Sequence, residues 1–138
     1  MHSKKVDHIG IAVSDVELAK RFYTKSLGLN VGCEEALDGM KIGFIRVGEV
    51  NLELIQSVAD RGVIGKFIAK RGEGVHHIAY EVEDVSSALE DLKAQGVELV
   101  DEAPRRGTHG KEVAFVHPKS SYGVLTELAC RKRRMQKA

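Results

Sequence analysis

Residues 8–16 read His8-Ile-Gly-Ile-Ala-Val-Ser-Asp-Val16, and residues 77–85 repeat this pattern as His77-Ile-Ala-Tyr-Glu-Val-Glu-Asp-Val85. The agreement continues downstream, where Leu52-Glu53-Leu54 has its counterpart in Thr126-Glu127-Leu128. Each copy therefore begins with a histidine and ends with a glutamate. If the two copies face each other, the two histidines and two glutamates can surround one divalent metal ion.

The composition is that of a small globular protein. The chain has 138 residues, of which 43% are hydrophobic, and this is enough for one domain with one core. No apolar run approaches the roughly 20 residues of a membrane span, and the first residues lack the apolar stretch of a signal peptide, so a cytoplasmic location is expected. The spacing of Cys33 and Cys130 fits neither a metal pair nor a dense disulfide pattern, which indicates two reduced thiols.

The positive charge is concentrated at the end of the chain. The net charge is +1, and five positive residues lie within the last eight positions. These residues are Arg131, Lys132, Arg133, Arg134 and Lys137. No aromatic residue stands among them to stack on bases, so the tail is interpreted as a solvated terminus and not as a nucleic-acid site.

The order of secondary structure predicted for the first copy is βαβββ. A strand is expected over Val6–Val13, followed by a helix that begins at the capping box Ser14-Asp-Val-Glu17 and stops at Gly28. Alternating apolar residues between turn residues then predict three further strands. These cover about Asn30–Glu34, Lys41–Val47 and Val50–Ser57.

The second copy repeats the order. A strand is expected over Val75–Val82, then a helix that Asp84 caps and that ends at Gln95-Gly96. Strands follow near Glu98–Glu102, Lys111–His117 and Gly123–Ala129, and a short helix over Ala59–Arg71 closes at Gly72 between the copies. The predicted fold is α+β: two tandem βαβββ modules forming a curled mixed sheet around a metal cavity. One domain, 1–138, would comprise module one (about 5–58), a linker helix (about 59–72), module two (about 73–130) and the basic tail (131–138).

Strand alternation predicts that both histidines lie on faces with small neighbours. His8 shares a face with Gly10 and Ala12, opposite Ile9, Ile11 and Val13, and His77 shares a face with Ala79, opposite Ile78, Tyr80 and Val82. The bulky faces are expected to pack against the two module helices. The small residues would then leave space for a cavity beside the histidines.

Glu53 and Glu127 occupy equivalent positions in otherwise apolar strands. A buried carboxylate is costly unless it is paired or binds a metal, so the metal interpretation is favoured over two exposed glutamates on edge strands. His76 and Gln56 lie on the opposite strand faces and rank as weaker ligand candidates. Two imidazoles and two carboxylates suit Zn²⁺, Co²⁺, Ni²⁺ or Mn²⁺. A six-coordinate ion would keep two positions for a bidentate oxygen substrate and act as a Lewis acid.

Several motifs carry a family resemblance. They are Asp7-His8-Ile-Gly-Ile-Ala-Val, Gly74-Val-His-His77-Ile-Ala, Gly107-Thr-His-Gly-Lys111 and His117-Pro-Lys-Ser-Ser-Tyr-Gly-Val-Leu-Thr-Glu127-Leu. With the paired modules, they make the chain resemble the vicinal oxygen chelate superfamily, which includes glyoxalases, bleomycin-resistance proteins and dioxygenases. Within that superfamily the motifs are most similar to those of methylmalonyl-CoA epimerases.

The resemblance implies a reaction and its residues. The expected activity is metal-dependent epimerisation of (S)- to (R)-methylmalonyl-CoA, by abstraction of the C2 proton through a metal-stabilised enolate. Metal ligands would be His8, Glu53, His77 and Glu127. Because inversion needs proton exchange on both faces, Glu53 and Glu127 are also the candidate bases. Ile42 stands where some similar epimerases have a glutamate.

The expected substrate is an acyl-CoA, and the fold family predicts a homodimer. Lys119, Ser120, Ser121 and Lys111 are the candidate substrate-binding residues, because positive and hydroxyl groups suit the phosphates of CoA. A glyoxalase I-like lyase (lactoylglutathione lyase type) acting on a hemithioacetal is the alternative enzyme, with the same ligands. A ligand-sequestering protein of the same fold is the non-enzymatic alternative.

Overall fold

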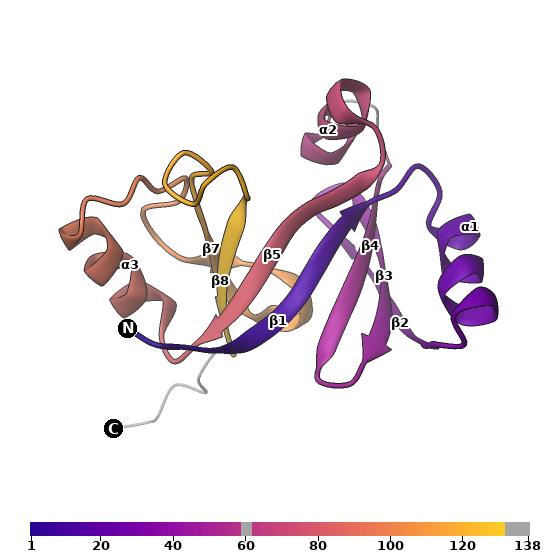
Figure 1. The fold of residues 1–138 in the computed structure, drawn as a ribbon, viewed down its shortest axis with the longest axis horizontal. Helices are drawn as coiled ribbons and strands as arrows, with labels where there is room; N and C mark the ends of the chain where they lie inside the picture. Colours follow the sequence, from indigo (N-terminus) through magenta and orange to yellow (C-terminus); the bar gives the residue numbers. More distant parts are fainter. Residues whose placement is uncertain (59–61, 132–138) are drawn as a thin grey trace. The chain divides into compact units, whose positions relative to one another are not determined.

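The computed structural model describes residues 1–58 and 62–131 (Figure 1). The strands are β1 (Ser3–Ala12), β2 (Asn30–Leu37), β3 (Met40–Val47), β4 (Val50–Ser57), β5 (Gly74–Val82), β6 (Arg105–Arg106), β7 (Glu112–Val116) and β8 (Thr126–Cys130). The helices are α1 (Val16–Arg21), α2 (Val63–Arg71) and α3 (Val85–Ala94), with a π-helical turn (Phe22–Ser26) and a 3-10 turn (Thr108–Gly110). The strands form one mixed sheet of order β2-β3-β4-β1-β5-β8-β7-β6. The predicted α+β class and mixed sheet are confirmed.

The chain divides into two compact units. The N-terminal unit is Asp7–Ile78, and the C-terminal unit combines Met1–Val6 with the chain from Ala79 onward. The divisions fall inside β1 and β5, so α2, predicted as a linker, belongs to the N-terminal unit. Residues 59–61 of the expected linker helix and 132–138 of the basic tail lie outside the described residues. The single-domain organisation stays a prediction.

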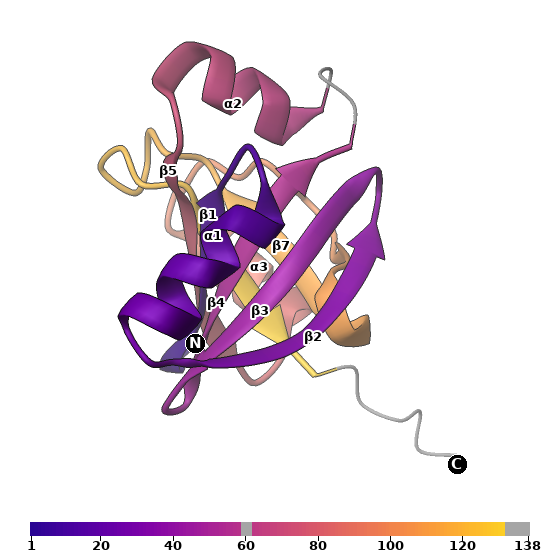
Figure 2. The same ribbon diagram turned by 90° about the vertical axis from the view of Figure 1, so that its right-hand side faces the viewer.

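In the N-terminal unit, a helix packs on each face of the strands. β1 pairs in parallel with β4, and β3 pairs antiparallel with both β2 and β4; Figure 2 shows β2, β3 and β4 side by side. Val16 of α1 packs with Ile45 and Leu54, and Val13 and Ile11 join this cluster. The prediction that the bulky face of the first strand packs against the first helix is therefore confirmed.

The opposite face, which carries His8, is filled at one end by a second core. Ala12 is fully buried with Ile42, Phe44 and Ile55 beneath Ile64 of α2. The prediction of open space beside Ala12 was therefore wrong, because the apolar face of α2 covers this end of the strand. The metal cavity itself stays a prediction.

The start of α1 differs from the predicted capping box. Asp15, and not Ser14, is the N-cap: it has an extended backbone, and its carboxylate accepts hydrogen bonds from the backbone N–H groups of Glu17 (2.9 Å) and Leu18 (3.2 Å). The Ser14 backbone N–H donates to the carboxylate of Glu73 at 2.8 Å. The helical segment ends before Gly28, whose φ of 69° is a left-handed conformation suited to glycine.

The C-terminal unit places α3 on β7 and β8 (Figure 1). Val85 and Leu89 of α3 pack against Ala114, Val116 and Leu128, and β7 pairs antiparallel with β6 and β8. As predicted, the Asp84 carboxylate caps the helix.

The strand predicted over 98–102 was wrong. Within it only Leu99 forms an isolated bridge, with Val116, and the strand that pairs with β7 on the side away from β8 is β6, Arg105–Arg106. The Asp101 carboxylate accepts the hydrogen bond of the Phe115 backbone N–H at 2.8 Å. A side chain thus accepts a hydrogen bond from the backbone of β7, which no alternation pattern reveals.

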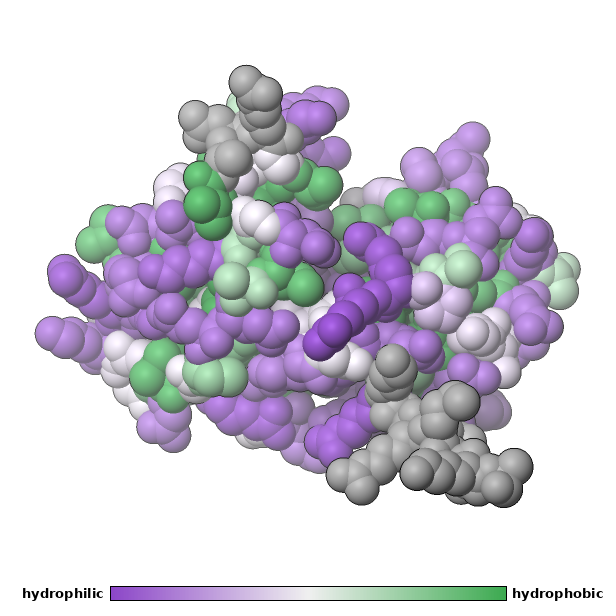
Figure 3. All heavy atoms as spheres, turned by 180° about the vertical axis from the view of Figure 1, so that it is seen from behind, coloured by the Kyte–Doolittle hydropathy of each residue, from purple (hydrophilic) through white to green (hydrophobic). Residues whose placement is uncertain are grey.

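Hydrophilic side chains cover most of the face drawn in Figure 3, and hydrophobic ones are scattered among them. Within residues 1–58 and 62–131, no helix is long and apolar enough to cross a membrane.

Candidate metal centre

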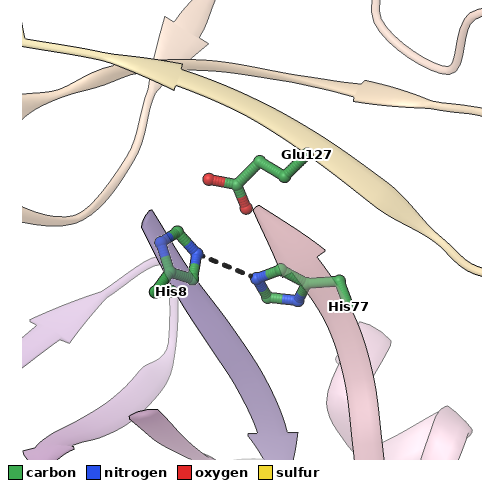
Figure 4. A group of neighbouring side chains, drawn as sticks. All are labelled: His8, His77 and Glu127. Atoms are coloured by element: carbon green, nitrogen blue, oxygen red, sulfur yellow. Dashed lines mark hydrogen bonds between the residues drawn. The ribbon is translucent and has the colours of Figure 1, made fainter. Parts of the chain in front are cut away.

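His8 on β1 and His77 on β5 face each other with their imidazoles. The two Nε2 atoms lie 3.1 Å apart, and the rings are perpendicular (Figure 4, dashed line). Both side chains are buried, with exposed fractions of 2% and 5%. The structure therefore brings these two predicted ligands together, although they are far apart in the sequence.

Gly10 makes room for the ring of His77. A Cβ atom at residue 10 would lie 2.2 Å from Cε1 of His77 and 2.5 Å from its Nδ1. Any side chain at this position would displace the imidazole, since real contacts of this kind are never so short. The absence of a side chain at Gly10 thus makes space for the imidazole of His77 itself.

Two buried carboxylates lie beside Nδ1 of His8. An oxygen of Asp7 is 2.7 Å from this nitrogen, and an oxygen of Glu53 is 3.3 Å from it. Glu53 comes from β4, where its Cα is the partner of Gly10 in the parallel pairing, and it is buried as predicted. Its carboxylate contacts His8 at Nδ1.

Sequence reasoning missed Asp7 as a site residue. It directly precedes His8, and alternation assigns neighbouring residues to opposite faces. A chemical argument could have identified it, because a ligand histidine usually donates its second ring N–H to a carboxylate or carbonyl.

His76, which ranked as a weaker ligand candidate, contacts one of the predicted ligands. Its Nδ1 lies 2.9 Å from Nδ1 of His77, and its ring packs edge-to-face against Phe67 of α2. Gln56 behaves as alternation predicted, because its side-chain oxygen accepts a hydrogen bond from the Val16 backbone N–H on the α1 side.

Glu127 lies in the C-terminal unit, on β8, where it pairs with Phe115 of β7; it is labelled in Figure 4. Its side chain is buried, as the repeat predicted. Exposed edge-strand glutamates, the alternative interpretation of Glu53 and Glu127, are therefore excluded.

The predicted substrate-binding residues lie in two loops of the C-terminal unit. Ser120 Oγ accepts from the Glu98 backbone N–H at 2.8 Å, and Ser121 Oγ donates to the Val124 carbonyl at 2.6 Å. The Ser121 hydroxyl thus bonds within its own loop, whereas the Ser120 hydroxyl joins that loop to the segment after α3. Lys119 is exposed in the same loop, and Lys111 is half-buried after the 3-10 turn. Substrate binding by these residues stays a prediction.

The two histidines fit a shared divalent ion. Imidazole nitrogens coordinate such ions at about 2.1 Å, so two of them at a right angle lie about 3.0 Å apart. The Nε2 atoms are 3.1 Å apart. Each ring also has a hydrogen-bonding partner at its other nitrogen, Nδ1, which is the usual arrangement around a ligand histidine.

The chain shares its sequence pattern with a family of known proteins. Residues 7–115 match the family described as the Glyoxalase/Bleomycin resistance protein/Dioxygenase superfamily. The chain belongs to this superfamily. The resemblance inferred from the repeat and its motifs is confirmed.

Members of the superfamily with similar sequences include epimerases. The ethylmalonyl-CoA/methylmalonyl-CoA epimerase of Cereibacter sphaeroides is 38% identical over 128 residues, which cover 90% of this chain and 96% of the relative. The uncharacterized protein YqjC of Bacillus subtilis is 40% identical over 126 residues, 90% of each chain. A solved methylmalonyl-CoA epimerase in complex with methylmalonyl-CoA and NH4+ is 34% identical, with a TM-score of 0.90 over 96% of this chain and 97% of that one.

Proposed function

We propose that this protein is a metal-dependent epimerase that interconverts (S)- and (R)-methylmalonyl-CoA. The observation that carries the proposal is the pair of buried imidazoles with facing Nε2 atoms, in a chain 38% identical to an epimerase of this substrate class. A homodimer remains the expected assembly.

His8, Glu53, His77 and Glu127 would hold one divalent ion, of the group Zn²⁺, Co²⁺, Ni²⁺ and Mn²⁺. When bound, such an ion supplies positive charge to the substrate's thioester and carboxylate oxygens. All four side chains are buried. Burial keeps water away from these groups, which strengthens electrostatic interactions at the site.

The proton at C2 needs a base on each face for inversion. Glu53 is the base candidate of the N-terminal unit, and Glu127, its equivalent in the repeat, is the candidate for the opposite face. β3 offers no carboxylate at the position of Ile42, whose side chain is 1% exposed and packs in the core with Ile55 and Ile64. The two repeat glutamates are therefore assigned both proton transfers.

Exchange of the C2 hydrogen tests this function. We expect the zinc- or cobalt-loaded protein to incorporate deuterium at C2 of methylmalonyl-CoA in D₂O and to convert the S form to the R form, far faster than a sample without protein. Ethylmalonyl-CoA is the parallel substrate. Turnover of the methylglyoxal–thiol adduct without C2 exchange would instead identify the lyase, and substrate binding without either reaction would identify the sequestering protein.

Substitution of Gly10 by alanine tests the position of the His77 imidazole. Because the new Cβ would overlap the imidazole, we expect divalent-metal affinity to fall at least about tenfold, the lower end of the effect of disturbing a ligand's surroundings. Affinity is measured by competition with a chromophoric chelator. Gly62→Ala is the matched control, since its Cβ would meet only the Ser57 hydroxyl, at 3.3 Å. Equal affinity in Gly10→Ala and the wild type would contradict the placement of His77.

A further inference from the structure

Four side chains of the N-terminal unit form a continuous series of close polar contacts. Asp7 contacts Nδ1 of His8 at 2.7 Å, Nε2 of His8 faces Nε2 of His77 at 3.1 Å, and Nδ1 of His77 contacts Nδ1 of His76 at 2.9 Å. The two inner members are the metal-ligand candidates. The two outer members, Asp7 and His76, have no role in the reaction described above.

At His8, the contact distances identify which carboxylate receives the ring proton. Asp7 at 2.7 Å has the distance of a strong charge-assisted hydrogen bond, whereas Glu53 at 3.3 Å does not. One N–H makes one strong hydrogen bond, so Nδ1–H of His8 donates to Asp7. A neutral imidazole has its lone pair on the other nitrogen, and for His8 this is the Nε2 that faces His77.

At His77, the acceptor is another imidazole. If Nε2 is the ligand atom, the proton of His77 is on Nδ1, which then donates to Nδ1 of His76. His76 must accept there, so its own proton is on Nε2. The edge-to-face contact of His76 with Phe67, with ring centroids 5.0 Å apart, holds the acceptor ring in place.

We propose that Asp7 and His76 are positioning residues that fix the tautomers and ring orientations of His8 and His77, so that both present Nε2 to the same ion. This inference rests on the metal site proposed above. The two residues differ in charge, since Asp7 is an anion that also raises the basicity of His8, whereas His76 is a neutral acceptor. Loss of Asp7 should therefore weaken metal binding more than loss of His76.

Zinc affinity, measured by chelator competition, separates the two contributions. We expect the dissociation constant to rise about 10- to 100-fold in Asp7→Ala, by less in Asp7→Asn, which keeps an acceptor oxygen, and about tenfold in His76→Ala. His76→Asn should restore near-wild-type affinity, because its side-chain oxygen can take the place of Nδ1. Asp38→Asn and His2→Ala, both at exposed positions, are the matched controls and should bind like the wild type.

A spectroscopic measurement on the wild-type protein is independent of whether any variant folds. Long-range ¹H–¹⁵N correlation spectra of the zinc-loaded chain should show Nδ1–H for His8 and His77 with Nε2 bound to zinc, and Nε2–H for His76. Coordination through Nδ1 of either histidine, or a proton on Nδ1 of His76, would overturn the inference. So would wild-type affinity in both alanine variants.

The outcomes also separate this inference from the proposed function. A wild-type chain that binds no divalent ion overturns both the metal site and the positioning roles. A wild-type chain that binds zinc and exchanges the C2 proton, while Asp7→Ala and His76→Ala bind zinc equally well, overturns only the positioning roles.

Discussion

Replacement of His8 by alanine is expected to abolish measurable epimerisation and to weaken divalent-metal binding by more than about 100-fold, beyond the range typical of changes around a ligand. His8 is nearly fully buried, and it contacts His77 through Nε2 and Asp7 and Glu53 through Nδ1. Removal of its ring takes away one proposed ligand and also the group that lies between two buried carboxylates. The mutual repulsion of these carboxylates then favours protonation of one of them.

Three measurements distinguish loss of the metal from loss of the fold. Elemental analysis of protein purified without added metal gives the occupancy, circular dichroism gives the folded fraction, and the rate of C2 deuterium incorporation gives the chemistry. His2→Ala removes an exposed imidazole and should leave all three unchanged. A folded His8→Ala protein that retains both stoichiometric metal and full exchange would contradict the assignment of this histidine.

The first module was predictable because its signals are local. Turn residues such as Gly39 and Gly48, both with positive φ, bound the strands, and the alternation between them identifies the buried face. The N-cap shows where local signals are ambiguous: Ser14 and Asp15 can both cap a helix. The equivalence of Asp15 with Asp84 in the repeat favours Asp15, which is the N-cap in the structure.

Contacts between the side chains of adjacent residues in one strand were not predictable from the same patterns. Alternation gives the side of the sheet on which a Cβ lies, but χ angles decide what the end of the side chain reaches. Asp7 and His76 each precede a predicted ligand, yet their polar atoms contact the rings of those ligands. Likewise, the packing of α2 over Ala12 depends on how the segment before β5 folds back, which the spacing of residues in the strand does not encode.

Replacement of Glu53 by glutamine should separate proton transfer from metal binding. The amide keeps the size of the side chain and one oxygen that can coordinate a metal, but it cannot accept a proton near neutral pH. We expect epimerisation to fall by roughly 10²- to 10⁴-fold, the usual contribution of a general base, while zinc affinity stays within about tenfold of the wild type. Glu53 is the base proposed for the N-terminal unit, and its side chain is buried beside His8.

The glutamine variants of the two repeat glutamates are expected to exchange the C2 hydrogen of opposite enantiomers. If each serves one face of C2, Glu53→Gln should fail to epimerise but still exchange the C2 hydrogen of one enantiomer, and Glu127→Gln should exchange that of the other. Glu90→Gln, at an exposed position of α3, is the control and should epimerise normally. If a single base served both faces, one variant would lose exchange with both enantiomers and the other would keep both. That result would contradict the division of the two proton transfers between the copies, because it would leave one of the two repeat glutamates as a metal ligand alone.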